Sequence, residues 1–299
     1  MKGKTMWTAV VLVLLATLAA GQAPEQYLDV YTAQVKPERR ADFDAITKKM
    51  VAANRQNKGD NWLTLETIYG NGNRVTFISM RNSYGETEKG SDSFYAALQK
   101  SLGKAGTDKL FQDYNQCVVG THSELRRRRW DLSSNPPADA AAMTKMLGET
   151  RWLRTTAVHV KPGQVTAFEA LLKEIKTARE KTSPPQTTLV SQAVAGQEGT
   201  VFYVSTLQSS MAGFDSIPTL QQTLGDEAYA RFLKTSADLV ADTETVINHF
   251  LPELSNPTED VVAVAPDYWR PKTAVAAKAT KGVVRAGETD KMDAKAEQR

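Results

Sequence analysis

The chain has 299 residues, 41% hydrophobic and 24% charged, a composition typical of a globular protein and a length that one hydrophobic core seldom serves. Its formal net charge of +3 falls to +1 when residues 1–21 are set aside, because they carry two lysines and no acidic residue. A near-neutral chain gives no support for nucleic-acid binding, so no nucleic-acid partner is predicted. Cys117 is the single cysteine, which excludes an intrachain disulfide.

Residues 1–21 have the pattern of a secretory signal peptide. Lys2 and Lys4 give a basic start, an apolar run extends from residue 6 to residue 20, and small residues up to Gly21 suit cleavage. The apolar run is shorter than the roughly 20 residues that a membrane-spanning helix needs. We therefore predict an exported protein, periplasmic or extracellular, cleaved near Gly21 and with no transmembrane span in the mature chain. An uncleaved anchor is the alternative.

Residues 26–133 predict six elements in the order β-α-β-β-α-β. Strand runs alternate and are rich in Val, Thr and aromatic residues, whereas helical runs place apolar residues three and four apart. The two middle strands are joined by Gly70-Asn71-Gly72-Asn73, residues that tolerate the positive φ of a tight hairpin turn. In chain order we predict a strand over 27–35, a helix over 38–56, strands over 62–69 and 74–81, a helical segment over 91–117 broken near Gly103, and a strand over 118–130.

The same order returns in residues 150–255. Val35-Lys36-Pro37 recurs 125 positions later as Val160-Lys161-Pro162, each time between a strand-like run and an amphipathic helix. Proline suits the first turn of a helix, because its φ is fixed and an N–H there would have no helical partner. The second set comprises a strand over 152–160, a helix over 163–181, strands over 188–195 and 201–206, and a helical segment that aligns with the earlier one at a shift of 122. We interpret the chain as an old tandem duplication.

Two stretches lie outside the two copies. Residues 134–149 hold an Asn-Pro-Pro turn and an alanine run, which are typical of a linker. Residues 256–299 lose apolar periodicity and are predicted to form a mostly disordered tail. The exception in that tail is the run 266–271, where the aromatic residues Tyr268 and Trp269 are suited to docking on the folded body.

Two β-α-β-β-α-β units, each with a V-K-P joint ahead of a helix that begins F-x-x-φ, resemble the dimeric α/β-barrel superfamily. This is the ferredoxin-like fold of NIPSNAP-like and antibiotic-biosynthesis-monooxygenase-like proteins, in which two units bring their sheets together into a barrel. The resemblance implies an α+β fold of two tandem ferredoxin-like repeats, residues 26–133 and 150–255, packed sheet to sheet as an intramolecular pseudo-dimeric α/β barrel. Such packing would cover the sheet face that the helices leave bare.

Strand alternation assigns candidate residues to the barrel interior. Ala33 and Val35, with their counterparts Val158 and Val160, are expected beneath the helices, which leaves His159 facing inward. His159 is therefore the candidate catalytic or ligand-contacting residue, and a histidine that is hydrogen-bonded within the sheet is the alternative. The full candidate ligand-binding set is Gln34, Trp62, Glu66, His159 and Gln192.

The remaining motifs do not indicate a specific functional site. Arg126–Arg129 can place no more than two guanidinium groups on one face of a strand, and they offer either an anionic contact or a solvated strand end. His122 and His249 do not align with each other, which favours unrelated surface imidazoles. Three scattered histidines and one cysteine give no cluster at metal-ligand spacing, so no metal and no cofactor are predicted. Hydrolase, metalloprotease and nucleotide motifs are absent from the sequence.

One function is favoured and two alternatives stay open. A cavity with a few polar groups among apolar ones suits a small, largely apolar ligand, so we predict binding of such a molecule inside the barrel. The resemblance offers a cofactor-independent monooxygenase or a haem-handling enzyme instead. Such pockets combine Asn, Trp and His, and here Trp62 and His159 are the nearest types while Gln34 stands where an asparagine would be. The second alternative is a non-catalytic scaffold or interaction protein.

Overall fold

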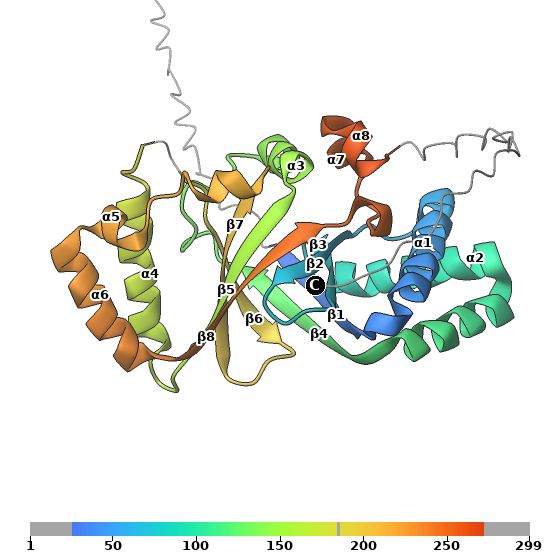
Figure 1. Cartoon of the computed structure of the whole chain (residues 1–299), viewed down its shortest axis with the longest axis horizontal. Helices are drawn as coiled ribbons and strands as arrows, with labels where there is room; N and C mark the ends of the chain where they lie inside the picture. The colour runs from blue at the N-terminus through green and yellow to red at the C-terminus, as the bar shows by residue number, and fades with distance from the viewer. Residues whose placement is uncertain (1–25, 184–185, 272–299) are drawn as a thin grey trace, which may run out of the picture.

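The computed structural model describes residues 26–183 and 186–271 (Figure 1). The predicted signal peptide, residues 1–21, and the last part of the predicted tail, residues 272–299, lie outside the described residues. Across the described ranges no helix is long and apolar enough to span a membrane.

The described chain alternates strands and helices in the predicted order. The first half contains β1 (Tyr27–Val35), a 3₁₀ turn (Pro37–Arg39), α1 (Arg40–Asn57), β2 (Leu63–Tyr69), β3 (Arg74–Arg81), α2 (Tyr84–Cys117) and β4 (Val118–Arg128). After α3 (Ala140–Glu149), the second half contains β5 (Trp152–Val160), α4 (Val165–Arg179), β6 (Leu189–Ala195), β7 (Thr200–Gln208), a 3₁₀ turn (Met211–Phe214), α5 (Leu220–Leu224), α6 (Asp226–Leu239) and β8 (Val240–Phe250). A 3₁₀ turn (Pro252–Leu254), α7 (Glu259–Val264) and α8 (Pro266–Trp269) follow.

All eight strands form one closed antiparallel barrel in the order β1-β3-β2-β8-β5-β7-β6-β4. The two halves meet along the pairs β2–β8 and β4–β6, while α1 and α2 lie outside one half and α4 to α6 outside the other (Figure 1). This confirms the α+β class and refines the expected sheet-to-sheet packing: the sheets join edge to edge. Unpaired strand edges expose N–H and C=O groups, and closure of the barrel satisfies them.

The recurring V-K-P motif ties a strand end to the end of a distant helix. The backbone N–H of Lys36 donates to Cys117 O at 2.8 Å, and its Nζ donates to Gln116 O at 2.9 Å. Lys161 repeats both bonds in the second half, from its N–H to Leu239 O at 2.8 Å and from Nζ to Ala237 O at 2.9 Å. Carbonyls at a helix C-terminus lack helical partners and favour a cation nearby, so each lysine caps α2 or α6.

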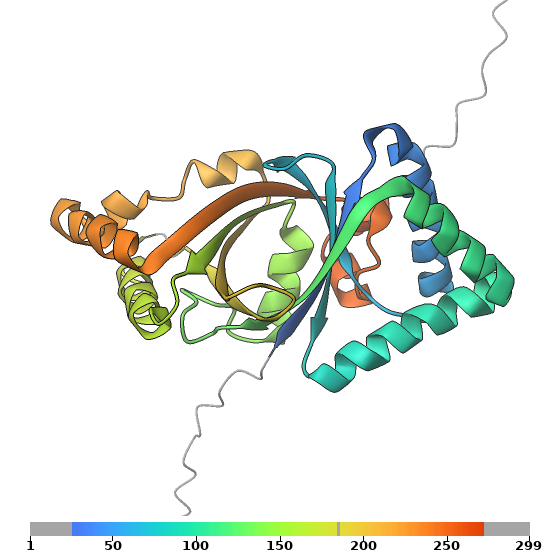
Figure 2. The same cartoon turned by 90° about the horizontal axis from the view of Figure 1, so that it is seen from below.

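A glycine interrupts the second helical segment of each half at the aligned position. Gly103 adopts φ 68° and ψ 171°, and Gly225 adopts φ 78° and ψ 160°. A side chain is strongly disfavoured in that region, which only glycine visits readily. The break splits α2 internally and separates α5 from α6, so that each segment bends around the outside of the barrel (Figure 2).

Each half has its own core between barrel and helices. Ala33 and Val35 pack beneath α1 with Phe43, and Val158 and Val160 pack beneath α4 with Phe168, as the alternation predicts. The remaining members of the first core include Ile46, Met50, Val75, Leu98, Leu110 and Tyr114, and those of the second include Leu171, Leu172, Val190 and Phe202.

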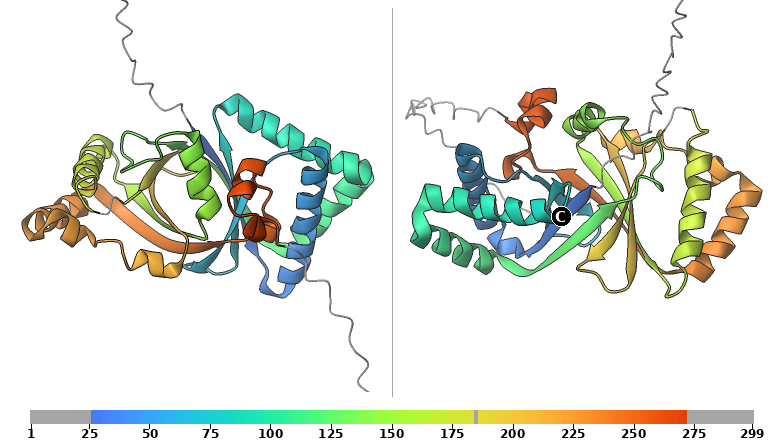
Figure 3. Two further views of the ribbon diagram at one scale, coloured as in Figure 1. Left: turned by 90° about the horizontal axis from the view of Figure 1, so that it is seen from above. Right: turned by 180° about the vertical axis from the view of Figure 1, so that it is seen from behind.

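A third core closes one end of the barrel. The predicted linker 134–149 contains α3, and the predicted disordered tail begins with α7 and α8, which lie beside α3 at the same end (Figures 1 and 3). Trp269 is fully buried there, and its Nε1 donates to Gly148 O at 2.9 Å. Leu147 of α3 and Leu65 of β2 belong to the same cluster. Figure 2, from the opposite side, shows α3 behind the ring of strands.

Candidate functional site

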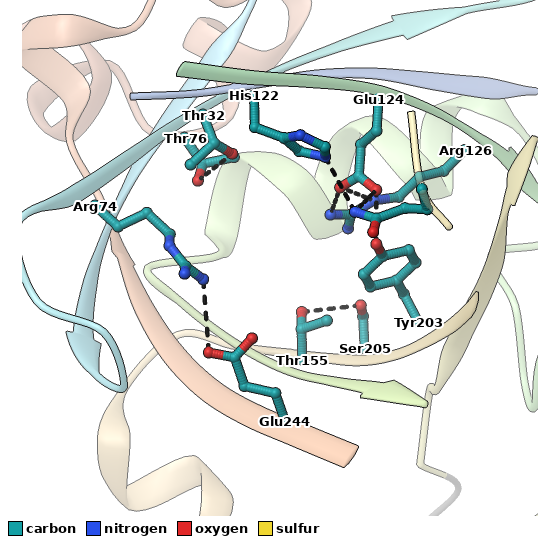
Figure 4. A network of polar contacts seen from close by, with 11 residues as sticks. Thr32, Arg74, Thr76, His122, Glu124, Arg126, Thr155, Tyr203, Ser205 and Glu244 are labelled. Atoms are coloured by element: carbon teal, nitrogen blue, oxygen red, sulfur yellow. Dashed lines mark hydrogen bonds and ion pairs between the residues drawn. The ribbon is translucent and has the colours of Figure 1, made fainter. Parts of the chain in front are cut away.

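The barrel encloses a cavity of about 290 Å³, which we call the lumen. The interior of an eight-stranded barrel is either filled by side chains or holds one small ligand. Side chains fill this lumen only in part, and its volume is close to the lower end of the range for small-molecule sites. Most of the residues that line it are polar, and Figure 4 shows a network that several of them form. The side chains that line it include Thr32, Arg74, Thr76, His122, Glu124, Arg126, Thr155, His159, Gln197, Tyr203, Glu244 and Asn248.

A buried carboxylate, Glu124, organises one wall of the lumen. It accepts hydrogen bonds from Arg126 Nε at 2.8 Å, Tyr203 OH at 2.6 Å and Gln197 Nε2 at 2.9 Å. The Arg126 guanidinium also lies flat on the Tyr203 ring, 3.4 Å from its centroid. Burial raises the pKa of Glu124, but the Arg126 charge and these hydrogen bonds outweigh burial and hold the pKa below its ordinary value.

The rest of the lumen changes character from its mouth to its floor. Near the mouth, the half-exposed Glu244 and Arg74 form an ion pair at 3.6 Å. Deeper in, hydroxyl groups bond in pairs across neighbouring strands, Thr32 with Thr76 at 3.2 Å and Thr155 with Ser205 at 3.0 Å (Figure 4). The floor is apolar, formed by Leu65, Ile78 and Leu153 against the third core.

The structure does not bring the five sequence-predicted ligand residues together. His159 lines the lumen, and Gln34 donates to Gly72 O at 2.8 Å in the β2–β3 turn. Trp62, Glu66 and Gln192 are not part of the lumen lining, which corrects the prediction that they face the barrel interior. Trp62 Nε1 donates to Leu254 O at 2.9 Å, while the two polar residues accept hydrogen bonds from outer arginines, Arg40 and Arg129, at 2.8 Å each. On β2 it is Leu65 and Thr67 that line the lumen.

A second cavity, of about 420 Å³, lies between the outer face of β1 and β3 and the helices α1 and α2. We call it the α1–α2 cleft. Aromatic rings form about half of its wall, and several contact one another, as Phe94 does with Trp62 at 5.7 Å and with Phe111 at 6.5 Å between ring centroids. The other rings are Tyr31, Phe77, Tyr95 and Tyr114.

Buried polar atoms in this cleft are left without well-formed hydrogen bonds. Thr47 Oγ1 has no partner within the described chain, and Tyr114 OH has only a loose interaction with Tyr31; both residues are less than a tenth exposed. Burial raises the pKa of Tyr114, so its phenol stays protonated and able to donate. Buried polar groups normally have partners, so two buried hydroxyls without well-formed bonds beside aromatic rings leave a place for a water molecule or a ligand.

One end of the cleft carries a charged group. Arg81 donates to both carboxylate oxygens of Asp60, at 2.7 and 2.6 Å, and lies 3.6 Å from Asp29. Burial raises the pKa of Asp29, an effect that the Arg81 charge opposes only in part. The guanidinium is packed against Gly90 of α2, where an added Cβ would lie 2.5 Å from Arg81 Cζ.

Gly90→Ala should therefore destabilise the protein, although alanine favours a helix. Overpacking of this kind costs about 1–3 kcal/mol, and it outweighs the gain of about 1 kcal/mol in helix propensity. Gly85→Ala is the control, because its nearest neighbour, Ser83 Oγ, lies 3.8 Å from the new Cβ. Urea unfolding of both variants measures the difference. A gain in stability for Gly90→Ala equal to that for Gly85→Ala would show that Arg81 is not confined there.

A third cavity, of about 540 Å³, lies in the corresponding place in the second half, between α4, α6 and the barrel. Phe168, Leu172 and Phe232 are among the apolar residues that line it. Its buried hydroxyl, Thr188, accepts a hydrogen bond from Arg179 at 2.7 Å. None of the orphaned buried side-chain atoms found within the described residues belongs to its lining.

Several other residues singled out in the sequence contact neighbours within the chain. Arg126 belongs to the lumen, and Arg129 of the same arginine run binds Asp131 at 2.8 Å and also pairs with Glu169. His249 packs against Trp152 with tilted rings, 4.5 Å between their centroids, and burial lowers the pKa of His249. Cys117 is buried, with its Sγ 3.3 Å from Asp113 O. The described residues contain no group of three metal-ligating side chains.

The fold is thus an α+β barrel with a polar lumen and with clefts beneath its outer helices. No protein-family model and no curated protein sequence matches the chain. Similar solved structures include a putative monooxygenase from Fusobacterium nucleatum, with 13% identity, a TM-score of 0.46 and coverage of 77% of this chain and 94% of that one. A mutant chlorite dismutase from Candidatus Nitrospira defluvii shows 10% identity, a TM-score of 0.41 and coverage of 80% and 94%. A heme-binding protein from Thermus thermophilus shows 11% identity, a TM-score of 0.42 and coverage of 77% of this chain and 92% of that one. Similarity this low carries no argument about activity.

Proposed function

We propose that this protein binds a small, largely apolar molecule with one or two polar groups, in the α1–α2 cleft. The observation that carries the proposal is the pair of buried, poorly bonded hydroxyls of Thr47 and Tyr114 beside a group of aromatic rings. A ligand that packs against the rings and bonds these hydroxyls would remove the cost of leaving them unpaired. The volume of about 420 Å³ is in the range of small-molecule sites.

This proposal moves the ligand from the barrel interior to the cleft, for an electrostatic reason. Glu124, Arg126, Arg74 and Glu244 all face the lumen, and burying an apolar molecule among them would strip water from their charges without replacing it. The cleft keeps its charged pair, Arg81 with Asp60, at one end. An uncharged, largely apolar ligand, which offers no charge to these groups, therefore suits the cleft and not the lumen.

A haem-handling role is not part of the proposal, because the donor set does not fit a histidine- or thiolate-bound haem. Neither helix-side cleft has a histidine or cysteine among its described lining residues. His122 and His159 face the lumen instead, which is too small and too polar for a macrocycle. Cys117 is buried beside Asp113. The proposal is accordingly for binding, without an assigned reaction.

We further propose that the two halves descend from one duplicated ferredoxin-like unit and that the protein acts outside the cytoplasm. The matching lysine caps, the matching glycine breaks and the strand bulges after Gln34 and His159 support the duplication. The basic and apolar pattern of residues 1–21 supports export. Fractionation of cells expressing the full chain, with the mature N-terminus sequenced, would test the second proposal.

The binding proposal is tested with Thr47→Val, a change that keeps the shape of the side chain and removes the orphaned hydroxyl. Titration with naphthol, an aromatic molecule with a single hydroxyl, should show affinity about tenfold lower in the variant, the worth of one hydrogen bond. The free energy of unfolding without ligand should change by less than about 1 kcal/mol, because no bond within the chain is lost. Isothermal titration calorimetry and urea unfolding supply the two measurements.

Thr107→Val is the matched control, since Thr107 is equally buried but bonds Gly103 O at 2.9 Å and lies outside the cleft. Its naphthol affinity should equal that of the unmodified protein. Mass spectrometry of material extracted from natively purified protein should identify the natural ligand. Equal naphthol affinity in all three proteins, or no binding at all, would remove the cleft as the site.

A further inference from the structure

The lumen is closed at one end and open to solvent at the other. Its floor is apolar and is backed by α3, α7 and α8, which close that end of the barrel (Figures 1 and 2). Leu65 on the floor is 1% exposed, whereas the side chains of Arg74 and Glu244 are 29% and 50% exposed. A ligand would therefore enter past Arg74 and Glu244 and meet hydrocarbon at the closed end.

The two arginines that face the lumen, Arg74 and Arg126, differ in whether their guanidinium groups already have hydrogen-bond partners. Arg126 is held by Glu124 and stacked on Tyr203, and Glu124 in turn is saturated by Arg126, Tyr203 and Gln197. The guanidinium of Arg74 makes no hydrogen bond to the described residues. Its single contact to an acid is the 3.6 Å ion pair with Glu244, longer than a hydrogen bond. The planar donor fork of Arg74 is thus available to a ligand.

We propose that the lumen is a second binding site, for a small aliphatic carboxylate whose carboxyl group binds Arg74 and whose alkyl chain points to the floor. Guanidinium binds carboxylate through two parallel N–H···O bonds, stronger than neutral hydrogen bonds. The hydroxyl pairs of the wall and the imidazole of His122 face the same space and supply further donors (Figure 4). His159 also lines the lumen. Leu65, Ile78 and Leu153 receive the chain.

The ends of the lumen restrict which anions fit. Inorganic phosphate would leave the apolar floor uncovered, and a dicarboxylate would place its second charge against that floor, where nothing offsets it. A long fatty acid exceeds a cavity of about 290 Å³ that is closed by the third core. Glu244 competes with the ligand for Arg74, so its charge weakens binding.

Calorimetry of the mature chain with hexanoate tests the proposal, because two variants have opposite expected effects. Arg74→Gln should lower hexanoate affinity about tenfold or more, the worth of a charge-assisted hydrogen bond. Glu244→Gln should raise the affinity several-fold, because the competing carboxylate is gone. General damage to the fold would weaken binding in both, so it does not mimic this pattern. Hexanamide, which lacks the charge, and succinate, which has two charges, should both bind more weakly than hexanoate.

The site is independent of the α1–α2 cleft, and the same variants show this. Arg74→Gln should leave naphthol affinity unchanged, and Thr47→Val should leave hexanoate affinity unchanged. Hexanoate affinity that is insensitive to Arg74→Gln, or equal to that of hexanamide, overturns the lumen proposal. Hexanoate affinity that falls in Thr47→Val assigns the carboxylate to the cleft and also overturns it.

Discussion

Trp269→Ala should lower the free energy of unfolding by about 3–5 kcal/mol, as expected for a large ring removed from a packed core. Trp269 is fully buried, packs against Phe250 and Tyr268 with 6.0 and 5.1 Å between ring centroids, and donates to Gly148 O. For a chain of this size the melting temperature should fall by roughly 10 °C. Thermal and urea unfolding followed by circular dichroism measure both quantities.

Tyr268→Phe is the control for this expectation. It removes only the hydrogen bond from Tyr268 OH to Phe250 O, at 2.9 Å, and keeps the ring on which Arg151 is stacked at 3.6 Å. A loss of about 0.5–1.5 kcal/mol is expected. If the two variants were equally stable, α8 would be a loosely attached segment and the floor of the lumen would be open to solvent.

Glu124→Ala should cost a similar amount, about 3–5 kcal/mol, because it leaves the Arg126 charge buried without its carboxylate. Tyr203 and Gln197 lose their acceptor in the same change. A double variant, Glu124→Leu with Arg126→Met, should recover much of the loss, since replacing a buried ion pair by apolar groups is far less costly than breaking it. A double variant as unstable as the single one would show that the loss comes from something other than the unpaired charge.

The same carboxylate predicts a dependence of stability on pH. The pKa of Glu124 lies below its ordinary value in the folded protein, so its contribution is present above the unfolded pKa and is lost as pH falls through the folded pKa. Glu124→Gln should remove that part of the acid sensitivity. Urea unfolding between neutral and acidic pH should therefore show the two proteins converging in stability as the pH falls.

The element order was predictable from the sequence because it rests on local periodicity. The break at Gly103 and the inward direction of His159 follow from the same signals, and the structure shows both. The failure on β2 also has a physical cause. Both of its faces are buried, with Trp62 and Thr64 on the helix side and Leu65 on the lumen side, so polarity does not distinguish them.

The polar wall of the lumen was missed because its members come from strands that only the closed barrel brings together. Glu124 and Arg126 are near each other in the sequence, but their partner Tyr203 belongs to the other half. The pairing of β4 with β6 leaves no periodic signal in the chain. The sequence predicted only part of the third core. The aromatic residues of 266–271 indicated docking on the folded body, but the alanine run of α3 gave no sign that this helix would form part of the surface on which they dock.

The seam between β2 and β8 has a consequence for how the chain reaches this state. Thr67 and Asn248, hydrogen-bonded at 2.9 Å, are 181 positions apart. During synthesis β2 therefore cannot pair with β8 until most of the polypeptide has been made. Contacts between such distant segments form slowly, and a waiting strand edge invites aggregation.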